Sequence, residues 1–291
     1  MDGSEAPSSA PTRRVLAAAA DLRAAPVGVF DSGIGGLTVL RELRAALASE
    51  RFTYLGDTAR LPYGTKSPAT VARYAVQAAD ALVEYGVKCI VVACNTACAL
   101  GLEAIRERVA PVPVIGVIEP GARAASGATR SGHIAVIATE GTVRGGAYQE
   151  AIHRLRPDAR VTAVATQLFV ALAEEGLSEG PVAESVIRHC LAPLYTAAPP
   201  APDTLVLGCT HFPVLATPIR NVVGAQVRIV DSAATTAHVV RTELTAAGLV
   251  REEGAGGVRF LATDGAERFA RVGSRFLGAS IAPEEVELID L

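Results

Sequence analysis

Two cysteines in this sequence stand where an apolar run gives way to polar residues. Cys94 follows the run CIVVA and Cys209 follows TLVLG, and in both places hydroxyl, amide or imidazole side chains come next. A thiol has an ordinary pKa of about 8.5, which falls toward neutrality beside a cation or at a helix N-terminus. Two such thiols on opposite sides of one carbon can remove a proton from one face and return one to the other. The pattern therefore predicts proton transfer that inverts a stereocentre.

The other cysteines need no chemical role. Free cysteine is among the most buried residue types, and this is how we interpret Cys89, Cys98 and Cys190. The number of cysteines is odd and no CxxC pair occurs, so we expect neither a secreted disulfide framework nor a metal site. Reduced thiols fit a cytoplasmic protein. A redox protein with a Cys94–Cys209 disulfide is an alternative.

Further polar residues end other apolar runs. His211, two residues beyond the second cysteine, can hold or shuttle the proton of that thiol. Asp31 and Ser32 lie in FDSGIGG, a strand followed by a glycine turn. Such a turn can cradle a phosphate, but the carboxylate of Asp31 would repel an anion. The two side chains suit an ammonium group and a carboxylate better.

The elements that must position these residues alternate regularly. From residue 26 onward, apolar runs that we expect to form strands alternate with amphipathic stretches that we expect to form helices. A second series of the same kind begins at residue 132. This order predicts parallel sheets covered on both faces, which bind ligands at the carboxyl ends of their strands. The segments expected to contain strands are 26–36, 51–57, 87–97, 112–120, 132–142, 160–166, 204–210, 227–233 and the start of 258–278.

Five of these strand ends carry small polar groups, a concentration that a mere scaffold does not need. Besides those already named they include Thr139, Thr142 and Asp57, although Asp57 is equally explained as a turn cap. The stretches 89–97 and 204–212 also echo one another, each with an apolar strand, a small residue, a cysteine and polar side chains. We therefore expect two similar α/β units that face each other across one cleft.

Composition excludes several partners. Of the 291 residues only 4% are aromatic and none is Trp, which argues against a stacking platform for nucleic acid. The formal net charge is -3, so the chain lacks the excess of positive charge that favours binding to nucleic acid. No apolar stretch is long enough to cross a membrane. Residues 1–24 are expected to be a disordered tail, because their apolar stretch, Val15–Ala20, is too short for a signal peptide.

Six motifs in order resemble those of the glutamate racemases: FDSGIGG, GDTARLPYG, ACNTA, VIEPG, GTVRGGAYQ and LGCTHFP. The resemblance runs from about Pro26 to about Gly278. It implies an enzyme that interconverts L- and D-glutamate without pyridoxal phosphate or any other cofactor, and that supplies D-glutamate for bacterial peptidoglycan. It also implies two pseudo-symmetric α/β domains, 25–120 plus 211–291 and 121–210, with the active site in the cleft between them. A homodimer is compatible with it.

The resemblance also implies roles for individual residues. Cys94 would take the α-proton of D-glutamate with help from Asp31. Cys209 would take that of L-glutamate with help from His211 and Glu174. The substrate contacts would come from Asp31, Ser32, Tyr63, Gly64, Asn95, Thr96, Thr210 and His211.

The chain departs from the family's pattern in two places. A segment similar to CPLFVPLVE is replaced by ATQLFVALAE at 165–174, and Gly145 stands where a serine is common. An aspartate or hydantoin racemase of the same superfamily is the nearest alternative, although His211 occupies a position where aspartate racemases tend to carry a glutamate. A non-catalytic protein that binds a small metabolite, with inert thiols, is the alternative of another class.

Overall fold

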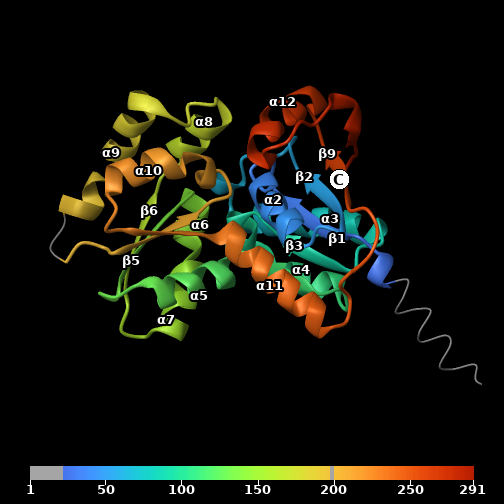
Figure 1. Cartoon of the computed structure of the whole chain (residues 1–291), viewed down its shortest axis with the longest axis horizontal. Coiled ribbons are helices and arrows are strands. Elements are labelled where there is room, and N and C mark those ends of the chain that lie inside the picture. The colour runs from blue at the N-terminus through green and yellow to red at the C-terminus, as the bar shows by residue number, and fades with distance from the viewer. Residues whose placement is uncertain (1–21, 197–199) are drawn as a thin grey trace, which may run out of the picture.

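The structure is a computed structural model, and it describes residues 22–196 and 200–291. Almost all of the tail expected at 1–24 lies outside the described residues. Two parallel sheets organise the rest of the chain into two units (Figure 1). The central strands of both sheets are buried at every residue, which requires cover on both faces. No helix within the described ranges is long and apolar enough to span a membrane.

The first unit contains a six-stranded sheet in the order β10-β9-β2-β1-β3-β4. Every neighbouring pair in it is parallel. Its strands are β1 (Val27–Asp31), β2 (Arg51–Gly56), β3 (Cys89–Val92), β4 (Val114–Gly116), β9 (Gly257–Ala262) and β10 (Val286–Leu288). Its helices are α2 (Leu37–Ala46), α3 (Pro68–Glu84), α4 (Asn95–Val109), α11 (Ser232–Ala246) and α12 (Ala266–Leu277), with short 3-10 turns at Tyr63–Thr65 and Pro283–Glu285.

The second unit contains a four-stranded parallel sheet in the order β6-β5-β7-β8. Its strands are β5 (His133–Ala138), β6 (Arg160–Ala165), β7 (Thr204–Gly208) and β8 (Arg228–Asp231). The helices that accompany it are α5 (Ile118–Ala128), α6 (Glu140–Gly145), α7 (Ala147–Leu155), α8 (Leu168–Glu174), α9 (Gly180–Thr196) and α10 (Ala216–Val223), with a 3-10 turn at Phe212–Leu215.

The second sheet repeats the order of the first. The order β2-β1-β3-β4 in the first unit corresponds to β6-β5-β7-β8 in the second, so β3 and β7 hold equivalent places. These are the two strands whose sequences echo one another. The predicted fold class, two pseudo-symmetric parallel-sheet α/β units, is confirmed. In this strand order a ligand crevice opens where β1 and β3 lie side by side, because their connections run to opposite sides.

The structure corrects two boundaries. Strand β8 pairs with β7, so the second sheet extends to Asp231, whereas we expected the chain to return to the first unit at residue 211. The predicted strand at 112–120 ends at Gly116, and α5 begins at Ile118. The helix can include Pro120, because a proline in the first turn of a helix lacks only an N–H that has no intrahelical partner.

A buried ion pair ties the first unit together at the start of β2. Lys88 Nζ lies 2.7 and 2.8 Å from the two carboxylate oxygens of Glu50, and both side chains are fully buried. The ammonium group also donates to the carbonyls of Arg23 and Leu249. Glu50 accepts a further hydrogen bond from the backbone N–H of Arg251. The pair therefore joins four segments that are distant in sequence.

Candidate active site

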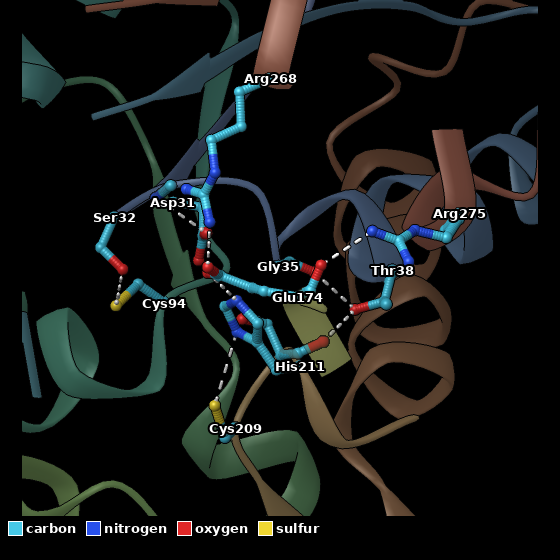
Figure 2. A network of polar contacts seen from close by, with 12 residues as sticks. Asp31, Ser32, Gly35, Thr38, Cys94, Glu174, Cys209, His211, Arg268 and Arg275 are labelled. Atoms are coloured by element: carbon cyan, nitrogen blue, oxygen red, sulfur yellow. Dashed lines mark hydrogen bonds and ion pairs between the residues drawn. The ribbon is translucent and has the colours of Figure 1, made fainter. Parts of the chain in front are cut away.

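Cys94 is positioned by the end of β3 and the start of α4. Its sulfur accepts a hydrogen bond from the backbone N–H of Ala97 at 3.4 Å and therefore caps the helix. The thiol donates to the hydroxyl of Ser32, at 3.3 Å, from the turn that follows β1 (Figure 2). The residue is only 5% exposed. The first of the two predicted thiols thus lies at the carboxyl end of β3, beside the end of β1.

The environment of Cys94 favours the neutral thiol. Burial, together with the nearby charge of Asp31, raises its pKa to about 12, although the hydrogen bonds with Ser32 and Ala97 act the other way. The expected lowering of the Cys94 pKa by the helix N-terminus is present, but burial outweighs it and the net shift is upward. One backbone N–H does not compensate for the removal of water around the sulfur.

Asp31 lies beside this thiol with half of its carboxylate unpartnered. The residue is completely buried, and its Oδ2 accepts a hydrogen bond from the backbone N–H of Gly33 at 3.0 Å. Its Oδ1 makes no hydrogen bond within the described ranges. Burial raises the pKa of Asp31, against the opposing effects of His211 and of neighbouring backbone N–H groups. A buried carboxylate with a free oxygen is a ready acceptor for an ammonium group.

Cys209 directly follows β7 and begins a chain of polar groups. His211 Nδ1 lies 3.8 Å from its sulfur, and the other ring nitrogen of His211 lies 3.0 Å from Glu174 Oε1. Glu174 Oε2 in turn lies 2.8 Å from a guanidinium nitrogen of Arg268 (Figure 2). The structure therefore brings the three residues predicted for this side together and adds Arg268. Cys209 is followed by a 3-10 turn, so the direct strand-to-helix turn expected here is absent.

Opposite charges stabilise this series of polar side chains. Burial lowers the pKa of His211, but hydrogen bonds to Cys209 and Glu174 and the charges of Cys209 and Asp31 outweigh burial and raise it to about 10. Burial raises the pKa of Glu174, but His211 and then Arg268 outweigh that effect and hold it below its ordinary value. At neutral pH an imidazolium ion therefore lies between the sulfur and a carboxylate.

Hydroxyl groups from both units meet at the start of α4, two residues beyond Cys94. Thr96 Oγ1, at the start of α4, lies 2.9 Å from Thr139 Oγ1 and 3.2 Å from Thr142 Oγ1 in the second unit. Tyr148 donates to Asn95 Oδ1 at 2.8 Å, which leaves Asn95 Nδ2 buried without a partner among the described residues. The free amide can donate to a carboxylate in the same site.

The remaining predicted contact residues are Tyr63, Gly64 and Thr210. The Tyr63 hydroxyl donates to Asp57, so a contact from Tyr63 to the substrate would come from its backbone. Gly64 packs so closely on Thr139 that a Cβ there would lie 2.7 Å from the threonine Cβ. The carbonyl of Thr210 accepts a hydrogen bond from Thr38 of the first unit at 2.9 Å. The contacts at 64 and 210 therefore join the two units.

Two polar residues at this site were missed by the sequence analysis. Thr166 and Gln167 follow β6, and both Thr166 Oγ1 and Gln167 Oε1 are buried without a hydrogen bond in the described part of the chain. Gln167 Oε1 faces Gly64, because a Cβ there would lie 3.1 Å from it. Both residues lie in ATQLFVALAE, so the departure from the family's pattern was the available signal.

The site contains free thiols and lacks metal-binding geometry. All five cysteines are free. Among residues 22–196 and 200–291 no group of three His, Cys, Asp or Glu side chains is placed to hold a metal ion. The side chains gathered here can donate, accept and hold protons, and they can pair with an ammonium group and a carboxylate.

Replacing Gly35 with alanine is expected to lower turnover about 10²-fold, because a displacement near 1 Å can misalign an acid–base group by that much. A Cβ at this position would lie 2.4 Å from His211 Nδ1 and 2.5 Å from Thr210 Oγ1, so the ring has to move. Steady-state kinetics would measure the loss. Gly127→Ala is the control, since nothing lies within 4 Å of a Cβ there. Unchanged turnover in Gly35→Ala would show that the position of the imidazole is not critical.

Comparisons with known proteins show the family of the chain. The family model described as Asp/Glu/Hydantoin racemase matches residues 27–240. A glutamate racemase of Geobacter metallireducens is 49% identical over 256 residues, which cover 88% of this chain and 93% of that relative. Two solved structures each align with 92% of this chain, and the alignment includes 98% of each of those chains. They are a glutamate racemase isoform of Bacillus anthracis (TM-score 0.86, 36% identity) and the Francisella tularensis glutamate racemase in complex with D-glutamate (TM-score 0.85, 34% identity).

Proposed function

Since the chain belongs to the Asp/Glu/hydantoin racemase family, we propose that it interconverts L- and D-glutamate by proton transfer between Cα and two thiols, Cys94 and Cys209. The chain is an isomerase, a racemase of this family. The observation that carries the two-thiol proposal is the position of the cysteines. They follow equivalent strands of two similar sheets, and each has its own buried polar partners.

The unpartnered atoms suit the backbone end of glutamate. Asp31 Oδ1 would accept from the α-ammonium group, and Asn95 Nδ2 would donate to the α-carboxylate. Hydroxyl groups of Thr96, Thr139 and Thr142 lie beside Asn95 and can reorient toward the substrate. The α-proton of an amino acid is far less acidic than a thiol, so these donors have to stabilise the carbanion in a site that excludes water.

In the proposed reaction each thiol serves one face of Cα. For L-glutamate, Cys209 takes the α-proton while Cys94, as a neutral thiol, delivers its own proton to the opposite face. For D-glutamate the transfers are reversed, and the ammonium group of the substrate would favour the Cys94 thiolate. After one turnover the two sulfurs have exchanged protonation states, so the protons balance without a cofactor or metal.

The setting of the reaction is also part of the proposal. We expect the protein to act in the cytoplasm and its D-glutamate to serve peptidoglycan synthesis. His211 next to the second Cys-Thr favours glutamate over aspartate as the substrate.

Incubating the purified protein with L-glutamate in D₂O, without added cofactor, tests the reaction. We expect D-glutamate to appear by chiral analysis, and proton NMR to show solvent deuterium at Cα. A folded sample that gives neither product would contradict the glutamate assignment. The same assay with L-aspartate would then test the nearest alternative substrate.

A further inference from the structure

Helix α12 belongs to the first unit but completes the Cys209 side of the site. The side chains of Arg268 and Arg275 both reach Glu174, which ends α8 in the second unit (Figures 1 and 2). Arg268 binds the carboxylate at 2.8 Å, and Arg275 donates to the main-chain carbonyl at 2.8 Å. The ring of Phe276 meets the ring of His211 edge-on, with centroids 5.2 Å apart. Helix α12 therefore contacts both His211 and Glu174, the two residues that assist Cys209 in the proposed reaction.

The two oxygens of Glu174 are divided between two partners. Oε1 binds the imidazole of His211, while Oε2 binds the guanidinium group of Arg268. The contact of one guanidinium nitrogen with Oε2 restrains the rotation of the Glu174 carboxylate. Its other oxygen then fixes the orientation of the imidazole, as a carboxylate does for histidine in hydrolase triads. Arg268 touches neither sulfur, so its effect on proton transfer has to pass through Glu174.

We propose that Arg268 is a positioning residue for the Cys209 side of the reaction, acting through the Glu174 carboxylate on the orientation of His211. This inference rests on the proposed function. The Cys94 side does not depend on α12, because its partners Asp31, Ser32 and Ala97 all come from the first unit near β1 and β3. The two sides therefore differ in their hydrogen-bonded support: the partners of the Cys94 sulfur lie within its own unit, whereas Glu174 on the Cys209 side is held by Arg268 of the opposite unit.

Replacing Arg268 with alanine is expected to lower kcat/KM about 10- to 100-fold, the range typical when groups that orient a metal-ligating histidine are removed. The loss has to be the same in both directions, because two enantiomers have equal free energy. Substrate isotope effects reveal which side is impaired. If Arg268→Ala slows the removal of the α-proton by Cys209, that step limits the rate more strongly, so the isotope effect on kcat/KM should rise for α-deuterated L-glutamate. It should fall for α-deuterated D-glutamate.

Two further variants separate positioning from general damage. Arg268→Lys keeps the positive charge and should recover part of the activity. Arg271→Ala removes an exposed arginine from the same helix and should leave kinetics unchanged. Wild-type kinetics in Arg268→Ala, or isotope effects that change equally for both enantiomers, would overturn the proposal.

A titration of the Glu174 carboxylate by carbon NMR tests the role of Arg268 without relying on any substrate. Arg268 contributes to holding the pKa of Glu174 below its ordinary value, so Arg268→Ala should raise that pKa whatever the substrate is. An unchanged Glu174 titration would overturn the link between Arg268 and the site. If the link is present but the wild-type protein does not racemise glutamate, the proposed function fails instead.

Discussion

Replacing either Cys94 or Cys209 with serine is expected to lower kcat for racemisation about 10²- to 10⁴-fold, the usual contribution of a positioned acid–base group. A serine hydroxyl has nearly the size of the thiol but is a far weaker acid, so it cannot provide the base. Each variant should lose turnover in both directions, because inversion needs one group on each face of Cα. Chiral chromatography of the product would measure the loss.

The control for this pair is Cys190→Ser, which changes a partly buried cysteine of α9, a helix that supplies none of the site residues described above. It should keep wild-type turnover. Calorimetry should show that both active-site variants still bind glutamate, since neither sulfur is needed to recognise its ammonium or carboxylate groups. Near wild-type turnover in either variant would contradict the two-thiol mechanism. A wild-type protein that binds glutamate but does not turn it over would instead support a binding protein with inert thiols.

Replacing Glu50 with alanine is expected to lower the free energy of unfolding by about 3–5 kcal/mol, the cost of leaving a buried charge without its partner. Lys88 would lose both carboxylate contacts in a site with no exposure to water, while Arg251 would lose an acceptor for its backbone N–H. Urea denaturation would measure the change. The site lies away from the thiols, so the activity of the folded fraction should be retained.

Glu103→Ala supplies a matched control for burial. The Arg106–Glu103 pair has the same separation as Lys88–Glu50, 2.7 Å, but its side chains are 43% and 77% exposed. Its loss should change the free energy of unfolding by at most about 1 kcal/mol. Similar effects of the two substitutions would mean that water reaches the Lys88–Glu50 pair.

Much of the architecture could be predicted from local patterns. Apolar runs and helical periodicity identify the strands and helices, and the echo between 89–97 and 204–212 predicts equivalent strands with a thiol after each. The local pattern does not say which sheet a strand joins. For that reason β8 was assigned to the wrong unit, although its position in the sequence was correct.

From the residues alone, only those site residues could be predicted that lie close in sequence to a cysteine or within a recognisable motif. His211 lies two residues from Cys209, and Asp31 lies in a recognisable glycine turn, but Glu174 came from the family resemblance alone. Arg268 gave no signal, because an arginine on an amphipathic helix looks like any solvated side chain. The raised pKa of Cys94 depends on burial in the folded protein and on Asp31, which is distant in sequence, so the segment around Cys94 does not reveal it.

The nesting of the second unit within the first has a consequence for synthesis on the ribosome. The chain enters the second unit after β4 and leaves it after β8, whereas β2 pairs with β9, Arg51 with Gly257. The second sheet is therefore complete in sequence at Asp231, before β9 and β10 have been translated. Until then the outer edge of β2 is open, and open edges invite pairing with other chains. A chain truncated before Gly257 would carry a complete second sheet, an unfinished first one and no Arg268.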